Sequence, residues 1–148
     1  MNVFLGGTCA TTKPLHGWRG RLIPMLEVDY YNPVVENWNE EAQKEEDRQK
    51  EISDMRLYVI TSEMTGVYSI AEVVDDSNKR PFRTVLCVLP EGFSEAQLRS
   101  LNAVKKLVAA NGGIVFDSLE KTAEFLNKAE LVFKLFNVSV DELKSSEE

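Results

Sequence analysis

The sequence is poor in the residues on which metal and redox sites depend. Its 148 residues include two cysteines, Cys9 and Cys87, and a single histidine, His16. Two thiols do not build a disulfide framework, and this inventory does not supply a zinc cluster of cysteine and histidine ligands. Cys87 lies in the apolar stretch TVLCVL, where a small buried side chain is expected. We therefore expect a protein that uses no metal ion and no other cofactor.

Long apolar runs and an excess of positive charge are also missing. No run approaches the ~18 apolar residues of a membrane-spanning helix, and the N-terminus does not have the pattern of a secretory signal. The formal net charge is −7, which disfavours long-range attraction to nucleic-acid phosphates. We expect a cytoplasmic protein that acts neither at a membrane nor on a nucleic-acid polymer.

What the chain does have is an alternation of short apolar strands with helices. The patterns predict strands at 2–6, 27–33, 56–61, 83–89 and 113–117, and helices at 18–26, 35–54, 66–79, 94–111 and 118–136. Such alternation predicts right-handed crossovers and a parallel sheet with helices on both faces. We predict a single α/β domain over 1–148, a flavodoxin-like three-layer sandwich with strand order 2-1-3-4-5, and a frayed tail at 140–148.

The predicted strand order places a binding site between the first and third strands. Ligands in such sheets bind beyond the carboxyl ends of the strands, at the point where the strand order reverses. The loops at that point are GGTCATTKPLHGW (6–18), NPVVENW (32–38) and TSEMTGVYSIAE (61–72). They contain most of the unusual residues of the chain, so we expect the site there.

The first of these loops opens with Gly6, Gly7 and Thr8. Glycines let a backbone approach a ligand closely, and exposed N–H groups can hold an anion. A turn that needs a positive φ explains the same residues equally well. Further on, Arg19 can pair with a phosphate or carboxylate or lie at the surface, and Trp18 can stack on a base or close the core.

The second loop offers Asn32 and Trp38. Asn32 can contact a ligand or cap the following helix, and its spacing favours capping.

The carboxylates of the helix at 66–79 are expected to differ in role. Glu72 lies near the start of this helix, where the dipole favours an ionised carboxylate by up to ~2 kcal/mol. An ionised carboxylate can attack a sugar carbon as an oxocarbenium ion develops, although a surface glutamate is the simpler interpretation. Asp75 and Asp76, further along, are predicted to face solvent.

The segments FLGGT, WR, NPVV, LYVIT and GVYSIAE together resemble the nucleoside 2-deoxyribosyltransferase-like family over residues 3–90. The resemblance implies cleavage of an N-glycosidic bond, or base exchange, on a (deoxy)nucleoside or nucleotide. GVYSIAE corresponds to the segment that ends in the family's nucleophile, which implies a glycosyl ester on Glu72. Tyr68 and Ser69 lie one turn earlier in the helix, where we expect them to contact the sugar or the carboxylate. Family relatives complete their sites across subunits, which implies a homodimer or larger even-numbered assembly. We expect its contacts on the helix at 66–79 or at 94–111.

Several family positions differ in this chain. Phe4 stands where the family has a tyrosine that orients the nucleophile, and Gly66 stands where an aspartate binds the sugar. Asp47 is the nearest match to the aspartate that handles the base, with Glu46 beside it. These departures leave open a nucleotide-binding or sensor module without catalysis, or an interaction domain that docks a partner on its acidic helix.

Overall fold

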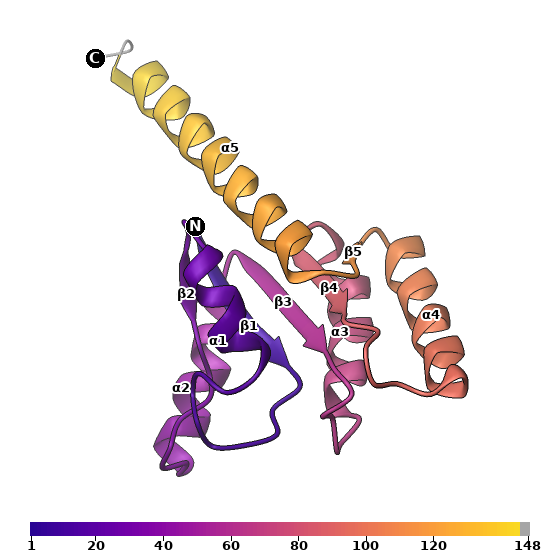
Figure 1. The fold of residues 1–148 in the computed structure, drawn as a ribbon. Coiled ribbons are helices and arrows are strands. Elements are labelled where there is room, and N and C mark those ends of the chain that lie inside the picture. Colours follow the sequence, from indigo (N-terminus) through magenta and orange to yellow (C-terminus); the bar gives the residue numbers. More distant parts are fainter. Residues whose placement is uncertain (146–148) are drawn as a thin grey trace.

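The five strands form one parallel sheet in the order β2-β1-β3-β4-β5, as predicted (Figure 1). The computed structural model describes the backbone of residues 1–145 and the side chains of residues 1–136. The strands are β1 (Asn2–Gly7), β2 (Asp29–Tyr31), β3 (Met55–Ile60), β4 (Thr84–Val88) and β5 (Ile114–Phe116).

Helices cover both faces of the sheet. They are α1 (Trp18–Leu22), α2 (Glu40–Ile52), α3 (Tyr68–Lys79), α4 (Glu95–Ala110) and α5 (Leu119–Ser145), with 3-10 turns η1 (Ile23–Met25) and η2 (Pro81–Arg83). One core cluster joins the sheet to α1 and α5, and a second joins it to α3 and α4. No helix in the described part of the chain is long and apolar enough to cross a membrane.

The central strand β3 explains why the sheet was predictable. Every residue from Met55 to Ile60 is buried. Successive side chains of a strand point to opposite faces. Accordingly, Leu57 and Val59 enter the core beneath α1 and α5, whereas Tyr58 and Ile60 enter the core beneath α3 and α4. A strand covered on both faces is apolar throughout, which is the signal that the run LYVI carries.

Some helix bounds differ from the prediction, and one difference shapes the site. The helix expected from residue 35 begins at Glu40, because the Asn39 side chain accepts a 2.8 Å hydrogen bond from Ala42 N and caps it there. Residues 35–39 therefore remain in a loop. At the other end of the chain, α5 continues past residue 136 to Ser145 (Figure 1). The remainder of the predicted frayed tail, 146–148, lies outside the described residues.

The apolar faces that we expected at a subunit interface pack inside the chain. Val73 of α3 and Val108 of α4 are both fully buried in the same core cluster. Large exposed apolar side chains remain on α3 (Tyr68) and α4 (Leu107), at Phe82 and, on α5, at Leu131, Val132 and Phe136. The assembly and its contacts stay a prediction.

Candidate active site

A cavity of about 270 Å³ opens at the carboxyl end of β1, where the strand order reverses. The loop after β1, the loop after β2, and helices α2 and α3 supply its walls. The lining residues are Phe4, Gly6, Gly7, Cys9, Thr11, Thr12, Arg19, Pro33, Val34, Val35, Trp38, Glu46, Ser69 and Glu72. The predicted loops thus meet around one hollow.

The predicted site residues divide into three groups. Those that line this cavity are Gly6, Gly7, Arg19, Trp38, Ser69 and Glu72. Thr8, Gly66 and Tyr68 line a neighbouring cavity of about 160 Å³, which shares Gly7, Cys9 and Ser69 with the first. Asn32 and Asp47 line neither of the two.

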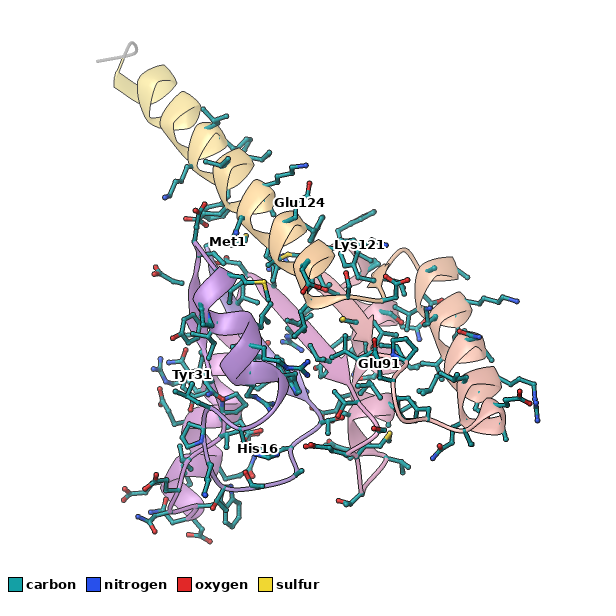
Figure 2. The ribbon with its side chains drawn as sticks, viewed as in Figure 1. Met1, His16, Tyr31, Glu91, Lys121 and Glu124 are labelled. Carbon is teal, nitrogen blue, oxygen red and sulfur yellow. The ribbon has the colours of Figure 1, made fainter. Side chains whose placement is uncertain are left out.

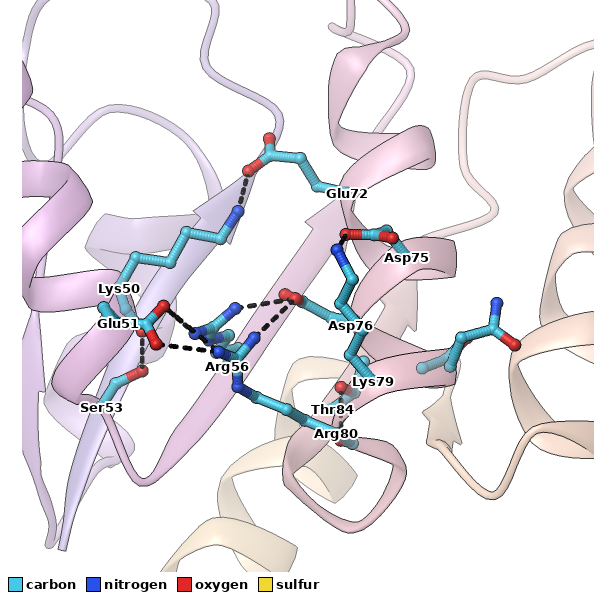
Figure 3. A network of polar contacts seen from close by, with 12 residues as sticks. Lys50, Glu51, Ser53, Arg56, Glu72, Asp75, Asp76, Lys79, Arg80 and Thr84 are labelled. Atoms are coloured by element: carbon cyan, nitrogen blue, oxygen red, sulfur yellow. Dashed lines mark hydrogen bonds and ion pairs between the residues drawn. The ribbon is translucent and has the colours of Figure 1, made fainter.

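Glu72 is held by a partner from a different helix. It lies one turn into α3, where helical side chains lean toward the N-terminus and so toward the strand ends. Its Oε2 forms an ion pair with Nζ of Lys50, from the last turn of α2 (Figure 3). The Glu72 and Lys50 side chains are only 20% and 22% exposed.

A second carboxylate, Glu46, faces the same cavity. Burial raises the pKa of Glu46, and the negative charges of Asp47 and Glu72 raise it further, against smaller opposing effects of nearby cations. Asp47, the residue that the sequence assigned to the base, is exposed, and its Oδ1 accepts a 3.0 Å hydrogen bond from Gln43. The side chain that α2 presents to the cavity is therefore Glu46 and not Asp47.

Spacing along α2 is a signal that relates Glu46 to Lys50. Residues three or four apart share a helix face. Glu46 lines the cavity, and Lys50, four residues further on, pairs with Glu72. Asp47 is three residues from Lys50 but is exposed, so spacing alone does not separate it from Glu46.

The Arg19 side chain is buried and bonded to the backbone, and its guanidinium is not free to bind a ligand. It is 3% exposed. Its Nε and Nη2 donate to Leu5 O at 3.3 and 2.9 Å, and its Nη1 donates to Thr8 O at 2.8 Å. Burial lowers its pKa to about 10, so the guanidinium stays charged at neutral pH. Trp18 is buried in the core and also donates to Thr8 O, at 2.9 Å. The pair therefore fixes the loop after β1.

Asn32 joins two loops and does not cap a helix. Its Nδ2 donates to Pro14 O at 2.8 Å, and its Oδ1 accepts from Val34 N at 3.1 Å. The capping function expected of it belongs to Asn39. Trp38, 61% exposed, lies between them and lines the cavity.

Phe4 forms an apolar wall of the cavity. Its ring stacks on Tyr31 of the edge strand β2, with centroids 6.0 Å apart and planes 21° apart (Tyr31 is labelled in Figure 2). Phe4 has no hydroxyl to direct at Glu72. Among the described residues, Lys50 is the side chain that the structure pairs with that carboxylate.

Of the two unusual glycines, Gly7 is the one that the backbone requires. Gly7 has a φ of 111°, and a Cβ there would collide with the backbone of Val59. A Cβ at Gly66 would meet no atom within 4 Å, and its φ is not positive. The backbone at Gly66 therefore does not require a glycine.

Substituting these two glycines should separate the two cases. Gly7→Ala should lower the free energy of unfolding by ~2 kcal/mol or more, because it adds a collision to an unfavourable backbone conformation. Gly66→Ala should change it by less than ~0.5 kcal/mol. Urea unfolding of both variants measures this. Equal losses would mean that the Gly66 turn is also constrained.

A buried ion-pair network lies behind the site and overturns one prediction. Asp76 was expected to face solvent, but its side chain is 4% exposed, and its Oδ1 pairs with Arg56 Nη1 at 2.7 Å (Figure 3). The Tyr58 hydroxyl donates to the other oxygen of Asp76. Burial, and then this bond, raise the pKa of Tyr58 far above its usual range, so the phenol stays a donor. Asp75 is exposed as predicted and pairs with Lys79 at 2.8 Å.

A larger cavity, about 450 Å³, lies on the other side of the strand ends, and neither Glu46 nor Glu72 lines it. Its walls include the carboxylates Glu63, Glu91, Asp117 and Glu120 (Glu91 is labelled in Figure 2). Two of them are already paired: Glu63 with His16 at 3.0 Å, and Asp117 with Lys121 at 3.2 Å. We place the candidate site in the smaller cavity because Glu46 and Glu72 meet there. No set of three or more potential ligands in the described residues is arranged to hold a metal ion.

Comparison with known proteins gives one result. The family model described as "Nucleoside 2-deoxyribosyltransferase like" matches residues 1–91. This segment contains every residue that lines the 270 Å³ cavity. Searches of curated proteins and of solved structures found no significant match.

Proposed function

The chain belongs to the nucleoside 2-deoxyribosyltransferase-like family, and we propose that it cleaves the N-glycosidic bond of a nucleoside through a glycosyl ester on Glu72. One observation carries the proposal: two carboxylates with different surroundings face one cavity at the switch point of the sheet. Glu72 is paired with a cation, whereas Glu46 is partly buried with a raised pKa. Two such groups suit a nucleophile and a proton donor.

In the first step, a Glu72 carboxylate oxygen attacks the anomeric carbon of the sugar. The new C–O bond forms as the C–N bond breaks, and the electron pair of that bond leaves with the base. Protonated Glu46 donates its proton to the departing base. In the second step, water or another base attacks the anomeric carbon, Glu72 leaves as a carboxylate, and Glu46 takes back a proton. Hydrolysis and base exchange differ only in this acceptor.

The same contacts favour a substrate without a 5′-phosphate. The N–H groups that the sequence offered to a phosphate are already used: Arg19 donates to two backbone carbonyls, and Thr8 N donates to Val59 O at 2.8 Å. The two carboxylates of the lining, Glu46 and Glu72, would repel an anion when ionised. A nucleoside therefore fits the cavity better than a nucleotide.

Replacing Glu46 with Gln should slow base release by about 10²- to 10⁴-fold, the usual contribution of a positioned proton donor. Because the active form of Glu46 is protonated and its pKa is raised, wild-type activity should fall as pH rises through that pKa. The variant should lack this alkaline limb. A pH–rate profile measures both effects. Asp47→Asn, one residue along α2 and exposed, is the matched control. It should keep base release and an alkaline limb, although the limb should move to lower pH, because the negative charge of Asp47 contributes to the raised pKa of Glu46. Loss of base release or of the limb in this variant would reassign the role to Asp47.

A screen of purified protein against ribo- and deoxynucleosides, with and without a 5′-phosphate, tests the proposal. Chromatography of the free base is the readout, and an acceptor base added in a second set of reactions separates exchange from hydrolysis. We expect release from at least one nucleoside by wild type and none by Glu72→Gln. Thermal stabilisation by a nucleotide without release from any substrate would instead support a binding or sensor module.

A further inference from the structure

Lys50 is the cation nearest to the proposed nucleophile, and it lies outside the cavity. Its Nζ pairs with Glu72 Oε2, yet Lys50 is not among the residues that line the hollow. A ligand in the cavity would thus touch Glu72, while Lys50 holds the far side of the carboxylate. This placement suits a group that acts on the nucleophile and not on the substrate.

The position of Lys50 is fixed by its neighbours. The Ser53 hydroxyl donates to Lys50 O at 2.8 Å (Figure 3). The adjacent Glu51 is held by Arg80 at 3.0 Å. The Lys50 ammonium also lies 5.7 Å from the centre of the Tyr58 ring, within range of a cation–π attraction. Lys50 is therefore anchored along its backbone and at its charged end.

We infer that Lys50 is a positioning residue for Glu72 that speeds the breakdown of the glycosyl ester; this inference rests on the proposed function. Before attack, the Lys50 ammonium orients the Glu72 carboxylate by a charge-assisted hydrogen bond. Phe4 cannot orient it in this way, because it has no hydroxyl. When the ester forms, Glu72 loses its negative charge, and the ion pair with Lys50 loses most of its strength. The ion pair is restored when the acceptor attacks the anomeric carbon and the C–O bond to Glu72 breaks. Lys50 therefore stabilises the leaving carboxylate.

This reasoning separates the two chemical steps. Removing the cation should slow the second step more than the first, because only the second step regenerates a charged carboxylate. From the usual strength of a hydrogen bond to a charged group, we expect ester breakdown to slow by about 10- to 100-fold. A purely structural role for Lys50 would instead lower the amount of active protein and reduce both steps together.

The experiment uses rapid-mixing kinetics on full-length wild type, Lys50→Met, Lys50→Arg and Lys44→Met, with the best nucleoside from the screen. Lys50→Met should release about one equivalent of base per site in a fast phase and then turn over slowly. Intact mass spectrometry should show the glycosylated protein accumulating. Lys50→Arg should restore most of the turnover. Lys44→Met, an exposed position on the same helix, should match wild type.

The outcomes separate this inference from the proposed function. If wild type releases base and Lys50→Met has the same ratio of fast to slow phase, Lys50 does not position Glu72, although Glu72 can still be the nucleophile. A proportional fall of both phases, with less folded protein by thermal unfolding, also overturns the inference. If wild type releases no base from any substrate, the proposed function and the role of Lys50 fall together.

Discussion

Glu72→Gln should abolish base release while the protein stays folded. An amide cannot serve as the nucleophile, and removing a covalent nucleophile costs an enzyme on the order of 10⁴-fold or more. The substitution keeps the size of the side chain. It also removes a partner of Lys50, but this ion pair is partly exposed, so the free energy of unfolding should change by less than ~1 kcal/mol. Base release tests the loss of activity and urea unfolding tests the retained stability, both measured on the same preparation.

Asp75→Asn is the matched control for this experiment. Asp75 is a carboxylate on the same helix, it is exposed, and it pairs with Lys79 away from the cavity. This variant should retain wild-type base release. Unchanged release by Glu72→Gln would show that another group forms the ester or that no ester forms. Loss of the fold in Glu72→Gln would instead identify the carboxylate as a structural partner of Lys50.

The fold could be predicted because its signals are local. The buried central strand is visible in the sequence as one apolar run. Glycines and polar residues at the ends of such runs indicate where the helices begin. Helix caps are equally local: Ser94 accepts from Gln97 N at 3.2 Å, and Ser118 accepts from Lys121 N at 3.2 Å, each three residues along the chain. Such features need only neighbouring residues to define them.

The site was less predictable because its partners come from different elements. Glu72 was found from its position in a family motif and from the helix dipole. Its cation, Lys50, is 22 residues away on another helix. The residues next to Glu72 and Lys50 in the sequence do not indicate that the two form an ion pair. For a related reason, the sequence could not show which of Glu46 and Asp47 lines the cavity. Adjacent residues on a helix point 100° apart, so a shift of one position moves a side chain out of the cavity.

The buried network shows the same limit. Asp76 follows an exposed aspartate, and charge alone made both look like surface residues. Its burial could have been inferred from spacing: Asp76 lies three residues after Val73, which is fully buried, and Arg56 places a charge within an apolar strand. A buried cation needs a partner, and the parallel crossover brings α3 across β3.

Asp76→Ala should destabilise the protein more than any other substitution considered for this chain. It leaves the Arg56 guanidinium, with a side chain 4% exposed, without its 2.7 Å partner, and it leaves the buried Tyr58 hydroxyl without an acceptor. Removing one member of a buried pair costs about 3–5 kcal/mol, because the remaining charge is desolvated. The Arg56 guanidinium would keep the exposed Glu51 carboxylate, 3.5 Å from its Nη2, as a weaker partner. For a chain of this length, that loss corresponds to a fall in melting temperature on the order of 10 °C.

The adjacent residue provides the control, and a double variant tests the cause. Asp75→Ala removes an exposed ion pair and should leave the urea midpoint of unfolding close to that of wild type. Arg56→Met combined with Asp76→Leu removes both charges and should be more stable than Asp76→Ala alone, because it leaves no buried guanidinium that has lost its buried carboxylate partner. A double variant as unstable as the single one would mean that Asp76 acts chiefly through Tyr58. Equal losses for Asp75→Ala and Asp76→Ala would mean that Asp76 is hydrated in solution, as the sequence first suggested.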